Sequence, residues 1–318
     1  MTSTSIDPSL DLFTEIEALK RSRKAVVLAH YYQDPDIQDI ADHLGDSLDL
    51  ARKAQDEEEA EVILFCGVHF MAETAKILNP NRTVILPDLE AGCSLAEACP
   101  AEDLRRYKAE HPDHFVLSYI NCTAAVKAES DLICTSSNAE KMLRSVPDDQ
   151  PVLFVPDKNL GAWLVEQTGR PMDLWPGSCQ VHVTFSERQI VSLKTKHRDA
   201  EFIAHPECED HVLRHADFIG STKRLLQRVA ESDCQTFIVG TETGILHTMQ
   251  KAAPHKTLIG APVENRSGCV ACSECPHMKL NTLEKVYLAL RDLEPQIEMD
   301  EDLRQRAEKP LRRMLELS

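Results

Sequence analysis

One pattern of residues occurs three times in this 318-residue chain, and it constrains the fold more than any other feature. Each copy starts with a short apolar run that leads into a histidine or tyrosine, and a hydroxyl residue follows 17 positions later, with an aspartate five positions before it. The three sets are His30, Asp42 and Ser47; Tyr119, Asp131 and Ser136; His205, Asp217 and Thr222. A period of roughly 85–90 residues fits a small α/β lobe rather than a solenoid repeat.

Further apolar runs complete each copy. A second run, rich in Val, Ile, Leu and Phe, follows each hydroxyl residue at 62–65, 152–155 and 237–239, and a third strand-like piece then leads to cysteine. Helical lengths separate these runs, which is typical of buried parallel strands in βαβ units. The sequence therefore predicts an α/β fold of three pseudo-symmetric lobes, with short parallel sheets, around a central cavity.

The repeat also predicts the domain organisation. We expect three α/β repeats over residues 1–98, 99–184 and 185–280, and C-terminal helices over 281–318 that pack on the body. Helices over 10–24, 102–110 and 187–197 should precede the first strand of each copy. Periodicity indicates two further helices over 282–293 and 302–317, and Pro310 should kink or divide the second of them.

Composition excludes several kinds of partner. The formal net charge of −17 argues against nucleic acid or an anionic membrane, because both need concentrated positive charge. Residues 1–10 lack the basic flank and apolar run of a signal peptide, and no apolar stretch reaches membrane-spanning length, so we expect a cytoplasmic protein. The cytosol keeps thiols reduced, so the 11 cysteines should not form a disulfide framework. Small core residues are expected at Cys66, Cys122, Cys134, Cys208 and Cys234.

The hydroxyl residues allow two interpretations. In parallel α/β sheets, ligands bind beyond the carboxyl ends of the strands, where helices begin. We expect Ser47, Ser136 and Thr222 to cap helices that start at residues 48, 138 and 223. Hydroxyls and free backbone N–H groups at a helix start can bind a carboxylate or a phosphate. The three residues are therefore either parts of a shared anion pocket or ordinary N-caps.

Three cysteines follow strand-like runs and precede helical ones, namely Cys93, Cys179 and Cys275. Three thiolates without a fourth ligand fit a zinc ion with an open position or a [4Fe–4S] cluster with one exposed iron. An all-thiolate set favours the cluster. The third copy contains two candidates for the third ligand. Cys269 lies 64 positions after His205 and fits the repeat spacing better than Cys275, which lies 70 positions after it.

Together these residues resemble the quinolinate synthase family of iron–sulfur enzymes, over nearly the whole chain. The resemblance starts at residues 29–33 and ends at 275–278; between them it rests on 45–48, 92–94, 119–124, 135–139, 176–179, 205–208 and 220–222. It implies one [4Fe–4S] cluster per chain, on Cys93, Cys179 and Cys275, the last because of its Cys-Pro-x-Met context. It also implies a transferase of NAD biosynthesis that condenses iminosuccinate with dihydroxyacetone phosphate to give quinolinate, phosphate and water.

The resemblance further implies the roles of individual residues. Substrate contacts are expected from His30, Ser47, Tyr119, Asn121, Ser136, His205, Glu207 and Thr222. Tyr32, His182 and Glu207 are the candidates for general acid and base. The open iron should act as a Lewis acid, because the reaction needs no net electron transfer. An aspartate oxidase that supplies the imine is an expected functional partner.

Several alternative interpretations remain. The three cysteines could hold zinc in a lyase or hydrolase, or the chain could be a non-catalytic iron–sulfur sensor or scaffold in which His30, Tyr119 and His205 are structural. Glu207 could instead cap a helix near Asp210. Cys269 and Cys272 could be a redox-responsive pair or spare thiols.

Overall fold

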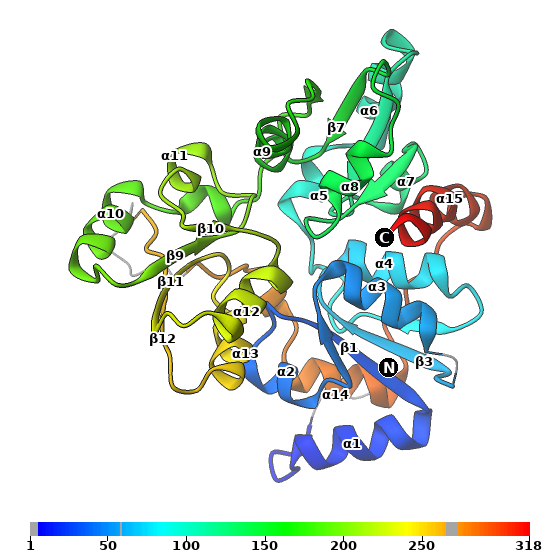
Figure 1. Ribbon diagram of the computed structural model, residues 1–318. Helices are drawn as coiled ribbons and strands as arrows, with labels where there is room; N and C mark the ends of the chain where they lie inside the picture. Colours follow the sequence, from blue (N-terminus) through cyan, green and yellow to red (C-terminus); the bar gives the residue numbers. More distant parts are fainter. Residues whose placement is uncertain (1–5, 58, 265–272) are drawn as a thin grey trace.

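The computed structural model describes residues 6–57, 59–264 and 273–318, so Cys269 and Cys272 lie outside the described residues. The described chain forms three four-stranded parallel sheets with helices around them, and Figure 1 shows the three resulting lobes grouped about a common centre. The α/β fold with three pseudo-symmetric lobes is therefore confirmed.

The helices and strands follow the chain in four groups. The first lobe contains α1 (Leu12–Arg23), β1 (Ala25–His30), α2 (Pro35–Ile40), β2 (His43–Gly45), α3 (Ser47–Asp56), β3 (Val62–Cys66), α4 (His69–Leu78) and β4 (Thr83–Ile85). The second contains α5 (Ser94–Ala98), α6 (Ala101–Glu110), β5 (Phe115–Tyr119), α7 (Ala124–Lys127), β6 (Leu132–Cys134), α8 (Ala139–Arg144), β7 (Val152–Val155), α9 (Lys158–Thr168) and β8 (Asp173–Leu174). The third contains the 3₁₀ helix η1 (His182–Thr184), α10 (Glu187–Lys196), β9 (Glu201–Ala204), α11 (Asp210–Leu213), β10 (Phe218–Ile219), α12 (Thr222–Glu231), β11 (Thr236–Gly240), α13 (Ile245–Ala252) and β12 (Thr257–Gly260). After them come η2 (Met278–Leu280), α14 (Leu283–Asp292) and α15 (Glu301–Leu317).

The three sheets have the same topology. Their strand orders are β2-β1-β3-β4, β6-β5-β7-β8 and β10-β9-β11-β12, so the first strand of each lobe lies between the second and the third. The central strands are buried along almost their whole length, as expected for parallel strands covered on both faces.

The repeated aspartates explain part of the sequence pattern. In each copy the aspartate carboxylate accepts a hydrogen bond of 2.8 Å from a backbone N–H group of the central strand. The donors are Val27 for Asp42, Val116 for Asp131 and Phe202 for Asp217. The backbone N–H of each aspartate donates in return to the carbonyl of the same strand residue. These residues therefore hold the second strand of each sheet in register, and they do not face the centre of the molecule.

The C-terminal helices pack on the first two lobes. Helix α14 contacts α1 and β3, whereas α15 contacts α4 of the first lobe together with α7 and β6 of the second. Helix α15 continues through Pro310, so the proline does not divide it. Pro310 lies on the buried side of the helix with Ala307, Leu311 and Met314, and packing of this apolar side offsets the lost backbone hydrogen bond.

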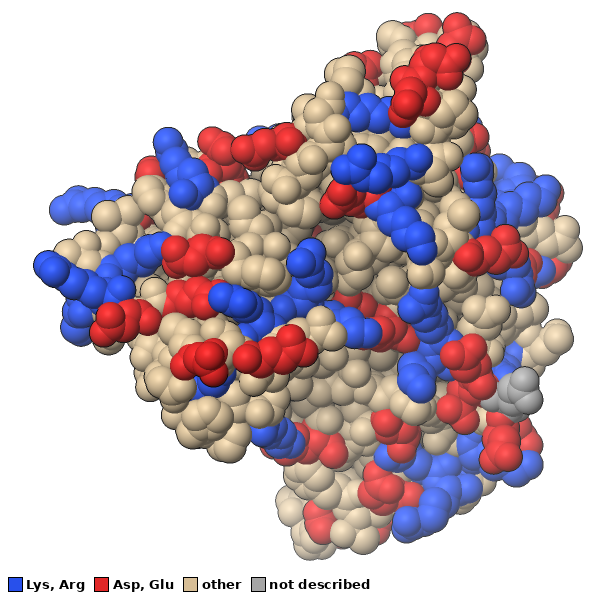
Figure 2. Space-filling model, in the orientation of Figure 1, with Lys and Arg blue, Asp and Glu red and all other residues tan. Residues whose placement is uncertain are grey.

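The surface carries charges of both signs. On the face drawn in Figure 2, Lys and Arg side chains are interspersed with Asp and Glu rather than gathered into one basic surface. Within the described ranges, no helix has the length and apolar character required to cross a membrane.

Candidate active site

A cavity lies where the three lobes meet, and its wall contains side chains from every lobe. All thirteen residues singled out from the sequence line it: His30, Tyr32, Ser47, Cys93, Tyr119, Asn121, Ser136, Cys179, His182, His205, Glu207, Thr222 and Cys275. The topology explains this convergence. His30 and Tyr119 are the last residues of β1 and β5, and His205 follows β9, so all three lie at the carboxyl ends of central strands.

The hydroxyl residues are not the N-caps that the sequence predicted. Helix α3 is capped by Asp46, whose Oδ1 accepts hydrogen bonds from two backbone N–H groups at 3.0 Å, and Ser47 is its first helical residue. Helix α12 is capped by Ser221, and Thr222 is its first residue. Ser136 lies two residues before the Asn138 N-cap of α8, and its Oγ is 3.2 Å from Nε2 of His205. Capping therefore does not occupy these three hydroxyls, which line the cavity instead.

Glu207 is the centre of a buried polar group in the cavity wall. Its Oε1 accepts a hydrogen bond of 2.6 Å from the hydroxyl of Tyr119. Its Oε2 lies 2.9 Å from Nδ1 of His182, within ion-pair distance, although the two groups are not aligned as a full hydrogen bond. Helix α11 is preceded by Glu209, so Glu207 does not cap it.

Charge and burial set the protonation of this group. Burial raises the pKa of the Glu207 carboxyl, but interactions with the imidazoles of His182 and His205 and with the hydroxyl of Tyr119 outweigh burial and hold that pKa below its ordinary value. Burial lowers the pKa of His30 to about 3 and that of His205 to about 4, so both rings are neutral near pH 7. The wall thus places the carboxylate of Glu207 beside the neutral imidazoles of His30 and His205.

The two tyrosines of the cavity remain protonated. Burial, and next the charge of Glu207, raises the pKa of both Tyr32 and Tyr119 well above the ordinary value. The Tyr32 hydroxyl lies 3.1 Å from Oγ1 of Thr222, which joins the first lobe to the third. Each tyrosine therefore brings a hydroxyl proton to the cavity wall.

The three cysteines have the same local environment. The sulfur of each is faced by the backbone N–H groups two and three residues further along: Leu95 and Ala96 for Cys93, Val181 and His182 for Cys179, His277 and Met278 for Cys275. Burial raises the pKa of all three thiols, and the backbone N–H groups lower it. Cys275 thus occupies the same structural position as Cys93 and Cys179, although the repeat spacing favoured Cys269.

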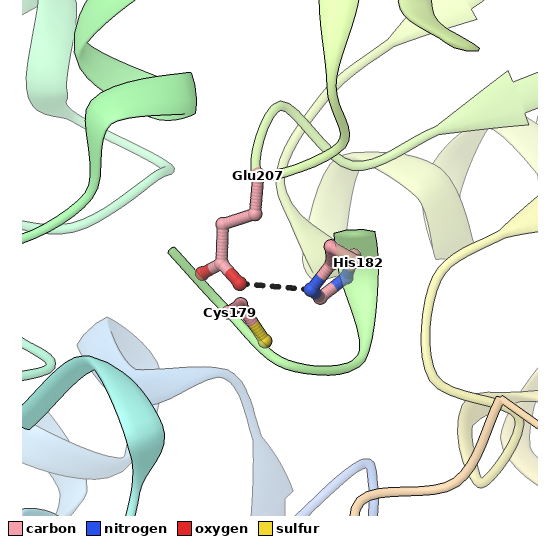
Figure 3. A group of neighbouring side chains, drawn as sticks. All are labelled: Cys179, His182 and Glu207. Atoms are coloured by element: carbon pink, nitrogen blue, oxygen red, sulfur yellow. Dashed lines mark ion pairs between the residues drawn. The ribbon is translucent and has the colours of Figure 1, made fainter. Parts of the chain in front are cut away.

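One of these cysteines also lies beside the buried polar group. Figure 3 shows Glu207 and His182 facing each other with Cys179 next to them. Their ligand atoms lie within 4.8 Å of one another, so these three residues could also hold a metal ion. Glu207, however, already accepts a hydrogen bond from Tyr119 and faces His182, which leaves the three cysteines as the more uniform ligand set.

Sequence reasoning missed several residues of the site. Val68, Phe70 and Met71 form an apolar part of the wall directly after β3, at the same edge of the sheet as His30. Glu242 lies just beyond β11, and its carboxylate accepts hydrogen bonds from the backbone N–H of Gly244, at 2.6 Å, and of Cys275, at 3.2 Å. Burial raises the pKa of Glu242 to about 7. Only their position in the sequence could have identified these residues, because they come directly after β3 and β11, at the carboxyl ends of these strands.

Comparisons with known proteins identify the family. Residues 14–316 match the family described as Quinolinate synthetase A protein (NadA). Proteins named quinolinate synthase from Trichodesmium erythraeum and Chloroherpeton thalassium are each 60% identical to the chain, over 97% of its length and 94% and 95% of theirs. The protein of that name from Thermosynechococcus vestitus is also 60% identical, over 97% of this chain and 96% of its own. The chain therefore belongs to the quinolinate synthetase A family.

Proposed function

We propose that this protein is a quinolinate synthase of NAD biosynthesis, which condenses iminosuccinate with dihydroxyacetone phosphate to give quinolinate, phosphate and water. Family membership supports the activity. One observation carries the proposal at the level of residues: His30, Tyr119 and His205 and the hydroxyl residues Ser47, Ser136 and Thr222 all line one cavity. A scaffold or sensor protein would not need this concentration of buried polar groups.

The polar wall suits two anionic substrates. We assign substrate binding to His30, Ser47, Tyr119, Asn121, Ser136, His205, Glu207 and Thr222. Hydroxyls and imidazole N–H groups can donate to carboxylate and phosphate oxygens. The side-chain oxygen of Asn121 is buried in the cavity wall and has no hydrogen-bond partner among the described residues, which is expected of a group that pairs with a ligand.

The three cysteines suit a [4Fe–4S] cluster. Cys93, Cys179 and Cys275 come from three segments and line one cavity. Each sulfur is faced by its own pair of backbone N–H groups at the same two positions along the chain, and hydrogen bonds to sulfur are typical of iron–sulfur sites. When bound, the cluster would supply a Lewis acid through the iron without a protein ligand. Burial raises the pKa of the three thiols and so disfavours their thiolate forms. Binding to a metal would offset this cost, because a metal-bound thiol is deprotonated.

Proton transfer is assigned to Glu207, Tyr32 and His182. All three line the cavity, and the carboxylate comes from the third lobe whereas the phenol comes from the first. The ionised Glu207 can accept a proton, while the protonated Tyr32 can donate one or accept a hydrogen bond. The apolar wall around Phe70 and Met71 limits water, which protects an imine substrate from hydrolysis.

The chemistry also indicates what surrounds this reaction in the cell. Iminosuccinate is the two-electron oxidation product of aspartate, so an aspartate-oxidising enzyme must supply it. We place the reaction in the cytoplasm, where thiols and an exposed iron stay reduced.

The test is anaerobic purification followed by three measurements. We expect about four irons and four sulfides per chain, a visible absorption shoulder, and quinolinate formation from the two substrates. Cys179→Ser should lose both iron and turnover, whereas Cys234→Ser, at a partly buried cysteine outside the cavity wall, should keep both. Zinc in place of iron would support the zinc alternative, and a full cluster without turnover would support a sensor.

A further inference from the structure

We propose that Glu242 is a positioning residue for the iron–sulfur cluster, because its carboxylate holds the chain segment that carries Cys275 against the third lobe. This inference rests on the cluster that is proposed for the three cysteines. Glu242 is the second residue after β11, and its side chain is fully buried in the cavity wall. It acts on the cluster through the backbone of Cys275 rather than as a ligand.

The segment in question, residues 273–281, is called the ligand strap below. It leads from the third lobe to the C-terminal helices and is fixed at both ends. The carbonyl of its first residue accepts a hydrogen bond of 3.0 Å from the backbone N–H of Thr243. The side chain of its last residue donates one of 2.7 Å to the carbonyl of Gly67 in the first lobe. Cys275 lies between these two ends, so the position of its sulfur depends on contacts within the strap.

The carboxylate of Glu242 supplies such a contact. Its Oε1 accepts a hydrogen bond of 3.2 Å from the backbone N–H of Cys275, and its Oε2 accepts one of 2.6 Å from the backbone N–H of Gly244. A Cβ atom at position 244 would lie 2.8 Å from Oε2 and 2.8 Å from the carbonyl of Tyr32, so the carboxylate is closely confined on this side. Glu242 therefore fixes the Cys275 backbone relative to the end of β11.

A lysine of the ligand strap joins this contact to the first lobe. Nζ of Lys279 lies 3.6 Å from Oε1 of Glu242 and 3.0 Å from Oδ1 of Asp34, and it donates a hydrogen bond of 3.1 Å to the carbonyl of Tyr32. The backbone N–H of Lys279 also donates to the carbonyl of Cys275 at 3.3 Å. The cysteine is thus held from the third lobe by Glu242 and from the first lobe by Lys279.

The lysine also explains how a carboxylate can lie next to a cluster ligand. Three thiolates carry negative charge, and an unpaired carboxylate beside them would be unfavourable, because like charges repel at short distance. Lys279 supplies the opposite charge to Glu242. The pair therefore holds the ligand strap without adding net charge beside the sulfur of Cys275.

Position in the repeat favours a specific role over a requirement of the fold. The second residue after the third strand is Val68 in the first lobe and Asp157 in the second. Asp157 caps its own helix, α9, whereas Val68 has no carboxylate. Helix α13 of the third lobe has no side-chain cap, so Glu242 does not serve it in that way. Its contact with Cys275 therefore belongs to the one lobe that leads into the ligand strap.

The first test measures iron retention in the holoenzyme, handled anaerobically. Glu242→Gln keeps the shape of the side chain, but the amide NH₂ group cannot accept a hydrogen bond, so one of the two backbone N–H groups loses its partner. We expect iron to pass to bathophenanthroline disulfonate about tenfold faster than in the wild type, since a hydrogen bond to a charged group is lost. Glu274→Gln, the same change at an exposed neighbour of Cys275, is the matched control and should stay within about twofold of the wild type.

The second test shows whether Cys275 is the ligand that is released. N-ethylmaleimide is added with the chelator, and peptide mass mapping follows the alkylation of Cys275 and of Cys179 in the same molecules. The ratio of the two alkylation rates should rise about fivefold or more in Glu242→Gln and stay unchanged in Glu274→Gln. An unchanged ratio in Glu242→Gln would indicate general loosening and would overturn the inference.

The remaining outcomes are equally decisive. Iron loss from Glu242→Gln at the rate of Glu274→Gln would overturn the inference, whatever the turnover. If Glu242→Gln does not fold, Lys279→Gln makes the same comparison, because it removes the cation that joins Glu242 to the first lobe. A wild-type protein that binds no iron would overturn the proposed cluster instead.

Discussion

Neighbouring residues at the start of α12 allow capping and ligand binding to be separated. Ser221 caps this helix, because its Oγ accepts a hydrogen bond from the backbone N–H of Arg224 at 3.4 Å. Thr222 is the first helical residue, and its hydroxyl lines the cavity and lies 3.1 Å from that of Tyr32. Ser221→Ala should therefore affect stability, and Thr222→Val should affect substrate binding.

The expected magnitudes differ enough to be measured. Loss of a serine N-cap costs about 0.5–2 kcal/mol, and the length of this bond places Ser221→Ala in the lower half of that range. Such a loss lowers the Tm of a protein of this size by about 1–3 °C. Loss of a hydrogen bond to a charged ligand costs about 1.5–3 kcal/mol. For Thr222→Val this corresponds to roughly 10- to 100-fold weaker binding of one substrate.

The assay combines anaerobic thermal melts with steady-state kinetics in which each substrate is varied in turn. Iron content serves as the control for both variants and should equal that of the wild type. The opposite pattern, with weaker binding in Ser221→Ala and only a lower Tm in Thr222→Val, would refute our assignment of the two hydroxyls.

Three further predictions concern the site and the repeat. Glu207→Gln and Tyr32→Phe should each lower turnover about a hundredfold and keep the cluster absorbance, and near-normal turnover in both would assign these residues to the fold. Cys275→Ser should lose iron and activity, because its sulfur occupies the same environment as those of the other two cysteines; a full cluster in this variant would move the ligand role to Cys269. Asp131→Ala should lower the free energy of unfolding by about 1 kcal/mol in denaturant titrations without changing KM, since its carboxylate binds only strand backbone, and a changed KM would contradict that role.

The repeat made most of the architecture predictable. Apolar runs spaced by helical lengths identified the central strands, and parallel strands bring their carboxyl ends to one edge of a sheet. Residues in register at these ends, such as His30, Tyr119 and His205, therefore had to lie in equivalent places. Their convergence on one cavity follows from the way in which the three lobes pack.

Helix boundaries and unique residues were not predictable in this way. Asp46 and Ser47, like Ser221 and Thr222, are adjacent residues that can both cap a helix, and only the backbone dihedral angles decide between them. Thr241, a buried residue directly after β11, has no hydroxyl counterpart in the other copies, so the repeat gave no signal for it. Its hydroxyl contacts the side chains of Tyr32 and His182, which are distant in sequence.

The arrangement of the three cysteines has a consequence for the unfolded chain. Cys93, Cys179 and Cys275 are 86 and 96 positions apart, so a cluster bound to all three would close two long loops. Closing a loop of that length removes chain entropy equivalent to about 4–5 kcal/mol in the denatured ensemble. Oxidative loss of the cluster would then remove a cross-link as well as an electrophile. The three lobes would then be held together by their packing and by the polypeptide segments that connect them.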